Sequence, residues 1–421
     1  RRREKRLRYK NKNKTASFKL ASLNIRGQGS QNISDPANKW NHVNQLLRTK
    51  EIAILCIQET HLTEERAAEI ESSFSRRFVR IISSADPVNP TAKGGVAIVL
   101  NRQFVKEDDD IHIEEIVPGR ALLIRTKWNS NRSITILNIY APNVTPSNGE
   151  ESKVFWETLL THFQDHPNAP KPDFVLGDFN MVEDVIDRLP SRSDPEDSVN
   201  ALDDLKLHLG IQDGWRAINP GANAYTYSSA WDSHSRIDRI YATRRMLKTA
   251  RDWEIQPADG IPSADHRMVS VHAVHEDDPL IGKGRWSLPH HLIKDKVFAK
   301  TLNELGRKAL EKIKSIPTRT NEENAQTIFA AFKTDLRAQG RKRAKFLKPL
   351  TELKLRKTTA ALQDIQSNLA LDESERRKEI SRLKREESDL EALLQKKIRT
   401  TTATRHWLEG ETVSKYWTQV N

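Results

Sequence analysis

The sequence predicts an α/β protein, a four-layer sandwich in which two facing β-sheets carry helices on their outer sides. An α-helical, partly coiled-coil extension is predicted to follow it. Three observations support this class. Residues 15–277 alternate short apolar runs of strand length with longer helix-like runs. Polar residues follow several of these apolar runs, as expected at strand ends. From about residue 292 the chain is rich in Lys, Arg, Glu and Leu and nearly free of Gly and Pro, a composition that favours helix.

The elements follow from the periodicity of the apolar residues. Strands are predicted at Phe18–Asn24, Ile52–Gln58, Arg77–Ile82, Gly95–Leu100, Ala121–Trp128, Ser133–Tyr140, Asp173–Leu176, Tyr225–Ser229, Arg236–Tyr241 and Met268–Val274. Helices are predicted at Asn38–Thr49, Glu64–Ser75, Glu150–Phe163 and Ser198–Leu209. Clusters of Asn, Asp, Pro and Gly mark the connections between these elements.

Charge divides the chain into predicted segments: a basic arm (1–14), a domain (15–277), a linker (278–291) and a basic helical spacer (292–421). The net charge of +12 is unevenly spread. Residues 278–421 hold 31 basic and 19 acidic residues, and residues 1–14 hold nine basic and one acidic. A mildly acidic domain between two basic segments suits a metal-dependent site whose flanks meet a polyanion.

Several classes of protein are excluded by composition. A single cysteine, Cys56, rules out a disulfide framework and a cysteine-based zinc site, and fits a reducing compartment. No apolar run approaches the roughly 20 residues needed to cross a bilayer, so no membrane partner is expected. The first residues, RRREKRLRYKNKNK, show no signal-peptide pattern and are compatible with a nuclear import signal. The chain lacks an initiator Met, which suggests a fragment of a longer protein.

The helical extension carries two series of apolar residues. Leu355, Leu362 and Leu369 recur every seven residues, and a second series runs Ile380, Leu383, Leu390 and Leu394. Asp372 with Glu375 forms a capping signal between them, which predicts an antiparallel helical hairpin or short coiled coil. A basic cluster that includes Arg341, Lys342 and Arg343 is dense enough for phosphate contact, although such faces are often only solvated.

Polar side chains with the chemistry of a metal site stand at the ends of predicted strands. Glu59 follows the apolar run ILCIQ, and a glutamate there is a candidate ligand for Mg²⁺, with Mn²⁺ as an alternative. Taken alone, a glutamate in the position of Glu59 is more often an ordinary acid at a strand end. Asn24 ends the first strand and is predicted to hydrogen-bond the Asp178 group or a metal-bound water, which places it among the metal-site residues.

A second group of candidates lies in the stretch VLGDFN. Asp178 and Asn180 are two residues apart, so both can reach one phosphate from a loop just past the strand. Asp178 is a candidate to orient or deprotonate an attacking water, and Asn180 to donate a hydrogen bond to a phosphoryl oxygen. The alternative is a turn, because Gly, Asp and Asn all favour turns.

A third group combines a histidine with nearby acids. Asp265 and His266 precede the predicted strand MVSVHAV, and a protonated His266 would stabilise negative charge on a reacting phosphate. Asp238, an acid inside the strand-like SRIDRIY, is the candidate partner of His266; the alternative is a surface ion pair with a neighbouring arginine. Tyr140 ends the strand ITILNIY and is a candidate phosphate contact, or simply a packing residue.

The order of these motifs (Asn, Glu, Tyr, Asp-x-Asn, Asp, Asp-His) resembles the endonuclease/exonuclease/phosphatase superfamily over about residues 17–275. The resemblance implies a DNase I-like sandwich that hydrolyses phosphate esters with Mg²⁺. It also implies that the eight matching residues form the active site: Asn24, Glu59, Tyr140, Asp178, Asn180, Asp238, Asp265 and His266. Asp265 is thereby a candidate metal-site residue.

Two positions depart from the pattern of that family. Arg26 stands where some members carry an acid, which leaves the number of metal ligands open. The usual Ser-Asp-His triplet is interrupted by Ala264, so Ser263 is not assigned the role of the family serine.

Further stretches are similar to the apurinic-type endonuclease of non-LTR retrotransposons, among them LNIRGQ, KGGVAIVLN and SRIDRIYAT. The stretch GKGRWSLPHHLIKD resembles the spacer that leads to a reverse transcriptase in fungal Tad-like elements. The resemblance implies an enzyme that nicks one DNA strand and leaves a 3′-hydroxyl to prime reverse transcription. DNA is then the expected partner, with element RNA and a downstream reverse transcriptase as further partners and the nucleus as the expected location.

DNA contacts are expected from surface loops and basic segments. The loop around residues 219–236 contains Tyr225, Tyr227 and Trp231, which are candidates to stack on or wedge between bases. The alternative is that these aromatics close the sandwich. Two other functions stay open: a related enzyme for abasic sites or lipid phosphodiesters, and an inactive remnant that only binds nucleic acid.

Overall fold

In a computed structural model of the chain, the described residues are 15–33, 35, 37–74, 79–105, 111–129, 132–144, 149–229, 231–258, 261–262, 264–279, 288, 292, 295–346, 350–368 and 370–390. The predicted basic arm therefore lies outside the described residues, as does most of the predicted linker. Contacts group the chain into two compact units, Arg1–Leu280 with Thr358–Asn421, and Ile281–Lys357. The predicted domain boundaries stay a prediction.

The first sheet has six strands in the order β14-β15-β1-β2-β4-β3. Its members are β1 (Phe18–Asn24), β2 (Ile54–Gln58), β3 (Val79–Ser84), β4 (Val96–Asn101), β14 (Arg251–Gln256) and β15 (Met268–Ala273). β1 and β2 are parallel, with Asn24 in register with Gln58, and the other pairs are antiparallel.

The second sheet also has six strands, in the order β10-β13-β8-β7-β6-β5. Its members are β5 (His112–Val117), β6 (Ala121–Asn129), β7 (Arg132–Tyr140), β8 (Phe174–Asp178), β10 (Ile211–Asp213) and β13 (Asp238–Thr243). β7 and β8 are parallel, which brings their final residues, Tyr140 and Asp178, side by side. Asp238, the first residue of antiparallel β13, is the register partner of Asp178 on the other side.

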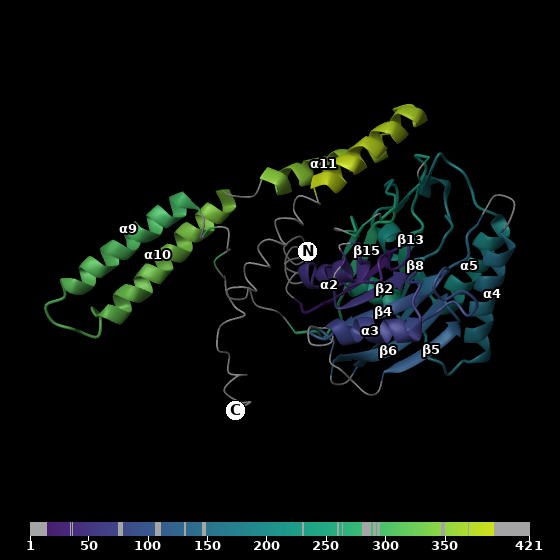
Figure 1. Cartoon of the computed structure of the whole chain (residues 1–421), viewed down its shortest axis with the longest axis horizontal. Helices are drawn as coiled ribbons and strands as arrows, with labels where there is room; N and C mark the ends of the chain where they lie inside the picture. The colour runs from purple at the N-terminus through teal and green to yellow at the C-terminus, as the bar shows by residue number, and fades with distance from the viewer. Residues whose placement is uncertain are drawn as a thin grey trace, which may run out of the picture. The chain divides into compact units, whose positions relative to one another are not determined.

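The two sheets pack face to face because successive apolar residues of a strand point to opposite sides of its sheet, so that every second one faces the other sheet. Leu20 faces the other sheet and joins Phe174 and Ile240 in one buried cluster. The adjacent Ala21 faces outward and packs beneath the helices α2 (Lys39–Thr49) and α3 (Glu64–Phe74). On the opposite side, α4 (Glu150–Asp165) and α5 (Glu196–Leu209) cover the second sheet. The four layers of helix, sheet, sheet and helix are visible in Figure 1, and the predicted fold class is confirmed.

Several elements escaped the sequence prediction. They are the edge strands β5 and β14, the short β10, the helices α6 (Gly214–Ile218) and α7 (Arg244–Thr249), the 3₁₀ turn η1 (Val185–Asp187), and two of the three strands of a small third sheet. β5 and β14 are the outermost strands of their sheets and carry charged residues on exposed positions, so they lack the apolar run of a central strand. The predicted strand Tyr225–Ser229 shortens to β11 (Tyr227–Ser228), which joins β12 (His234–Ser235) and β9 (Arg188–Leu189).

The described part of the C-terminal region is largely helical, as predicted; residues 391–421, with the predicted Leu394, and Leu369 lie outside the described residues. α9 (Lys296–Lys314) and α10 (Ala325–Phe346) belong to the second unit, and α11 (Leu350–Ser367) leads back into the first. Residues 373–390 form a further helix, which begins where the carboxylate of Asp372 accepts a hydrogen bond from the backbone N–H of Ser374. Within the described part of the chain, no helix is long and apolar enough to span a bilayer.

Candidate active site

An asparagine at the end of β1 joins two of the predicted acids. The side-chain amide of Asn24 donates to Glu59 Oε1 at 2.8 Å and to Asp178 Oδ2 at 2.9 Å. Its oxygen accepts the backbone N–H of Arg26 at 2.9 Å, so both ends of the amide are occupied. The Asn24 nitrogen therefore faces the carboxylates. This orientation indicates that Asn24 holds the carboxylates of Glu59 and Asp178 together. It argues against the prediction that Asn24 binds a metal ion through its side-chain oxygen.

The chain makes a sharp backbone turn at each of three strand ends that reach the site. Arg26, Glu59 and Asn180 all have positive φ angles, of 50°, 51° and 52°. Non-glycine residues seldom adopt this left-handed region, and such residues concentrate at functional sites. Gly177 in β8 is likewise required by the backbone geometry, because a Cβ at this position would lie 2.0 Å from the backbone oxygen of Ile139. Glycine thus lets β7 and β8 approach closely just before Asp178.

Tyr140 contacts the carboxylate of Glu59. Its hydroxyl donates to Glu59 Oε1 at 3.2 Å, and the guanidinium of Arg120 lies 5.4 Å from the ring centroid. Burial and the charges of Glu59 and Asp178 raise the pKa of Tyr140 strongly, so the hydroxyl stays a neutral donor. The structure thus places Tyr140 against the acid that was predicted to bind metal, and its predicted contact with phosphate remains a prediction.

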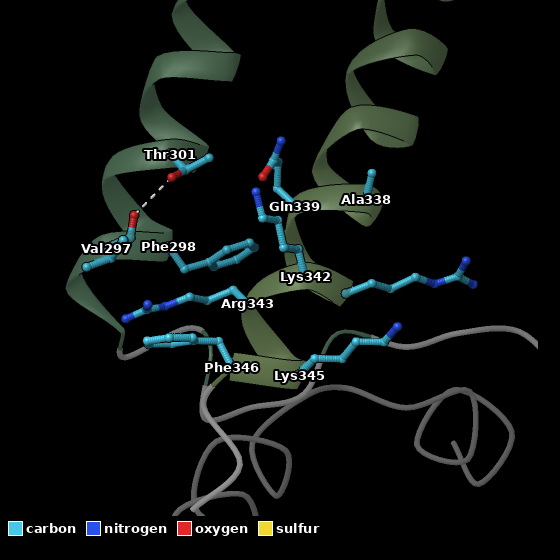
Figure 2. A pocket seen from close by; sticks show the side chains of 10 residues that line it. Val297, Phe298, Thr301, Ala338, Gln339, Lys342, Arg343, Lys345 and Phe346 are labelled. Carbon is cyan, nitrogen blue, oxygen red and sulfur yellow. Dashed lines mark hydrogen bonds between the residues drawn. The ribbon is translucent and has the colours of Figure 1, made fainter.

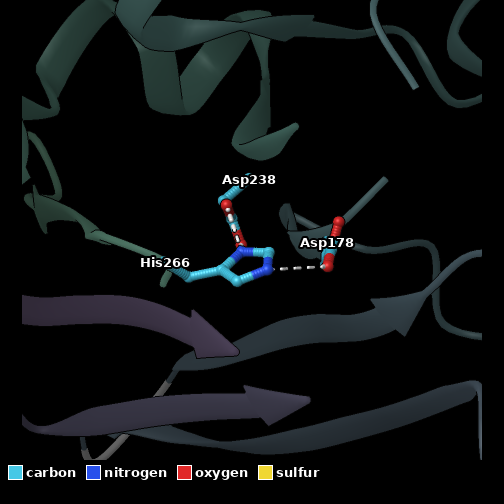
Figure 3. Close-up of side chains that lie close together, drawn as sticks. All are labelled: Asp178, Asp238 and His266. Carbon is cyan, nitrogen blue, oxygen red and sulfur yellow. Dashed lines mark hydrogen bonds and ion pairs between the residues drawn. The ribbon is translucent and has the colours of Figure 1, made fainter. Parts of the chain in front are cut away.

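The histidine lies between two buried aspartates, as Figure 3 shows. Its Nδ1 lies 2.9 Å and 3.1 Å from the two oxygens of Asp238, and its Nε2 lies 3.9 Å from Asp178 Oδ2. The predicted pairing of Asp238 with His266 is thus present in the geometry. The alternative, an ion pair of Asp238 with Arg236 or Arg239, is not seen, because these arginines contact other acids, among them Asp187 and Glu183.

The close charges shift the ionisation of this group. Burial and the charge of Asp238 raise the pKa of Asp178 to about 7, against the lowering effect of the histidine. Burial alone lowers the pKa of His266, but Asp238 above all, with Asp178 and Asp265, outweighs it and raises that pKa to about 10. The site therefore holds a cationic imidazole next to a carboxylate that exchanges a proton near neutral pH.

Several of these charged residues border a cavity of about 680 Å³. Glu59, Asn180, Asp265 and His266 line it together with Tyr227 and the arginines Arg26, Arg188 and Arg192. Acids and cations on the walls of one cavity suit a ligand that combines a metal ion with a phosphate. Sequence reasoning missed Arg188 and Arg192; Arg188 lies in the short strand β9, which has no recognisable periodicity.

Asp265 lies at the rim of this cavity beside Arg26. One of its oxygens pairs with the Arg26 guanidinium at 3.1 Å, and its other oxygen is buried with no hydrogen-bond partner in the described structure. An unpartnered buried carboxylate oxygen fits a cation as its missing partner. Carboxylate oxygens are the hard ligands that Mg²⁺ prefers, and Glu59 and Asp265 both line this cavity. Among the described residues, Asp178, Asp238 and His266 form a group whose ligand atoms lie within 4.8 Å of one another, so the chemistry of the site fits a cation.

The three aromatic residues predicted to contact DNA have different surroundings. Trp231 is 85% exposed, and Tyr227 lies in the cavity with its ring 4.9 Å from that of His266. Tyr225 is only 2% exposed and packs with Leu189, Leu362 and Ile380. The prediction of base stacking is therefore wrong for Tyr225, because its ring fills a hydrophobic core between the sandwich and the C-terminal helices.

The basic cluster of α10 lies in the other compact unit, around a cavity of about 750 Å³ between α9 and α10 (Figure 2). Arg343 makes two hydrogen bonds of 2.9 Å to Asp295, the N-cap of α9, and lies over the ring of Phe346. Its charge thus stabilises this pair of helices. Arg341 and Lys342 line the same cavity, and their predicted contact with nucleic acid stays a prediction.

The comparison with known sequences identifies the family. Residues 21–266 match the Endonuclease/Exonuclease/phosphatase family, and the chain belongs to this family. The predicted resemblance is confirmed, and the chain is a member of an enzyme family of phosphodiester hydrolases. It is 29% identical over 267 residues to the Transposon TX1 uncharacterized 149 kDa protein of Xenopus laevis. That match covers 62% of this chain and 19% of the relative, so the chain spans about a fifth of that protein.

Solved structures show the same fold. The AP endonuclease LMAP from Leishmania major superposes with a TM-score of 0.50 at 14% identity, covering 62% of this chain and 88% of that one. The 3′-5′ exonuclease NExo from Neisseria meningitidis gives a TM-score of 0.50 at 19% identity, covering 61% and 100%. At these identities the likeness concerns the fold alone, and the substrate has to be argued from the site.

Proposed function

We propose that this chain is a divalent-cation-dependent DNA endonuclease of a non-LTR retrotransposon, which nicks one strand and leaves a 3′-hydroxyl that primes reverse transcription. One observation carries the proposal: Asn24, Glu59, Asp178, Asp238 and His266, which are distant in sequence, meet beside one cavity. The similarity to a Xenopus laevis transposon protein supports the retrotransposon origin. Element RNA, a reverse transcriptase and a nuclear location remain predictions.

The chemical steps of nicking can be assigned to three residues in or beside the cavity. Asp178 is a carboxylate with a pKa near neutral, so it accepts the proton of an attacking water. His266 stays protonated beside Asp238 and offers its Nε2 side to negative charge that develops on the phosphate. Asn180 uses one amide N–H on the Ala141 carbonyl at 2.9 Å, which leaves the second for a phosphoryl oxygen.

The proposed cation site also consists of acidic residues at this cavity. Glu59 and Asp265 would hold it, with Asp178 near it and Asn24 keeping the carboxylates of Glu59 and Asp178 together. A bound Mg²⁺ or Mn²⁺ would supply Lewis-acid stabilisation of the phosphate charge. The exposed Arg192 adds a positive charge to the cavity wall, where it would contact a backbone phosphate, whereas Arg188 is paired with the buried Asp194.

The test uses supercoiled plasmid with Mg²⁺ and compares the wild type with an Asp178→Ala, His266→Ala double variant. Open-circular product from the wild type alone supports the proposal. Glu59→Gln or His266→Ala is expected to reduce nicking by at least about a hundredfold, the usual effect of losing one catalytic group. Full activity in either single variant would refute that residue's assignment.

The same preparation separates the alternatives. Cleavage confined to DNA with abasic sites would indicate a repair enzyme, and release of phosphorylated head groups from lipid vesicles would indicate a lipid phosphodiesterase. Binding of plasmid without any cleavage, in Mg²⁺ or in Mn²⁺, would indicate a remnant that only binds nucleic acid.

A further inference from the structure

The end of the helical region packs against the sandwich beside the candidate active site. Residues 358–367 of α11 and the helix 373–390 form an antiparallel pair, since Thr359, near the start of the first segment, donates to Glu387, near the end of the second, at 2.7 Å. We call residues 358–368 and 370–390 the C-terminal hairpin. Leu362, Ile380 and Leu383 of this hairpin bury their side chains against Leu189 and Tyr225 of the sandwich.

Polar contacts hold the hairpin to residues next to the catalytic histidine. Arg267, which directly follows His266, pairs with the nearly buried Glu387 at 2.6 Å. Lys384 donates to the hydroxyl of Ser228, whose backbone N–H in turn bonds the carbonyl of Asp265 at 3.1 Å. The hairpin thus contacts Arg267, directly after the Asp265-His266 pair, and Ser228, which bonds the backbone of Asp265.

A second set of bonds supports the loop that carries the exposed tryptophan. Arg377 donates to the backbone oxygens of Trp231 and Asp232 at 2.7 Å and 2.9 Å. Ser381 donates to the carboxylate of Asp232 at 2.5 Å, and Asp232 has a positive φ of 56°. These bonds hold the backbone of the loop while the Trp231 side chain stays 85% exposed.

The hairpin and the sandwich enclose a groove of about 850 Å³. The groove shares Arg26, Tyr227, Asp265 and His266 with the catalytic cavity, so the two hollows adjoin. Its charged walls comprise three arginines (Arg26, Arg267 and Arg385), two acids (Asp265 and Glu387) and His266, together with Lys384, whose pKa burial lowers to about 7. Arg26 pairs with Asp265 and Arg267 with Glu387, whereas Arg385 is exposed. Trp231, Ile261 and two prolines give it an apolar side. A polyanion with flat apolar faces is the ligand that such walls fit.

We propose that the C-terminal hairpin is part of the substrate-binding surface, and that the exposed Arg385 binds a backbone phosphate of the DNA strand next to the scissile phosphate. This inference rests on the proposed function, because the groove is assigned to DNA through its junction with the catalytic cavity. The sandwich alone, residues 15–277, would then lack one wall of its DNA groove and would leave Leu189 and Tyr225 without their covering.

Duplex binding tests the assignment in the full chain. Fluorescence anisotropy with a labelled 20-base-pair duplex is measured in buffer with EDTA, so that no cleavage occurs. Arg385→Ala is expected to raise Kd by about 5–10-fold and to reduce the salt slope of log Kd by about one, as for one lost phosphate contact. The matched control is Arg382→Ala, an exposed arginine of the same helix that pairs with Glu379 and Glu386 and does not line the groove. It is expected to stay within twofold of the wild type.

Equal Kd values and salt slopes for the two arginine variants would overturn the proposal. An Arg385→Glu variant, which reverses the charge at this position, guards against a small single effect and is expected to weaken binding by about 30-fold or more. The thermal unfolding midpoint of each variant confirms that the fold is intact, and an unchanged Kd in a folded Arg385→Glu variant would also overturn the proposal.

Hydrolysis of a small substrate separates this inference from the proposed function. Bis(4-nitrophenyl) phosphate reaches the catalytic cavity but is too short to follow the groove. Arg385→Ala is therefore expected to retain the wild-type rate on it in Mg²⁺ while its KM for plasmid rises. A wild-type chain that hydrolyses neither substrate would refute the proposed function, whereas the binding comparison in EDTA would still decide whether the hairpin contacts DNA.

Discussion

Replacing Asp238 by asparagine is expected to move the pH range of nicking downward. Asp238 lies 2.9 Å from His266 Nδ1, and its charge is the main reason why the pKa of His266 rises to about 10 although burial lowers it. In Asp238→Asn that pKa falls toward the ordinary value of 6.5. At pH 7.5 the protonated fraction of His266 would then be about one tenth of the wild-type fraction, and at pH 9 about one three-hundredth.

The same substitution favours the ionised form of Asp178, which accepts a proton, whereas it disfavours the protonated form of His266. Losing the charge of Asp238 lowers the pKa of Asp178 below about 7, so this carboxylate is ionised over a wider range. Any loss of rate above pH 7 must therefore come from His266. The expected result is a nicking rate that falls about tenfold at pH 7.5, falls further at pH 9, and recovers near pH 6.

The measurement is a pH–rate profile on supercoiled plasmid, paired with an NMR titration of the His266 ring without divalent cation. Asp204→Asn, which removes an exposed carboxylate of α5, is the control for a change in net charge. The reasoning fails if His266 in Asp238→Asn still titrates near pH 10, or if the rate of that variant matches the wild type at pH 9.

Three further changes test the fold. Gly177→Ala places a Cβ 2.0 Å from the Ile139 carbonyl and is expected to lower the free energy of unfolding by about 3 kcal/mol in urea, whereas Gly221→Ala, with open space around it, stays within about 0.5 kcal/mol. Glu183 has a pKa lowered to about 2, because its arginine and lysine partners outweigh burial. Its stabilising effect is thus present above pH 4.5 and lost as the pH falls toward 2. Glu183→Gln should therefore cost up to about 3 kcal/mol at pH 6 and little at pH 2, as equilibrium unfolding at the two pH values would show. Tyr225→Ala is expected to destabilise the chain by about 3–5 kcal/mol in thermal or urea unfolding, because the ring is a core residue, and a loss of DNA binding without loss of stability would contradict this.

Local patterns in the sequence were sufficient for the central strands and for the types of residue at their ends. Strands such as β2 and β8 are buried along their whole length, so their apolar runs are continuous and easily recognised. The edge strands β5 and β14 escaped prediction because one side of each meets solvent and tolerates charge. The sequence likewise indicated that Asp372 caps a second helix of a hairpin, as observed.

What a side chain contacts was decided only in three dimensions. The sequence by itself determined that an asparagine, a glutamate, several aspartates and a histidine follow buried strands, and that this order is typical of one enzyme family. The tertiary structure decided that the Asn24 nitrogen faces two carboxylates, that Asp238 pairs with His266 and not with a neighbouring arginine, and that Tyr225 is covered by a hairpin more than 130 residues further along the chain. Periodicity reports whether a residue faces inward or outward, whereas these contacts join distant segments whose meeting depends on strand order and register.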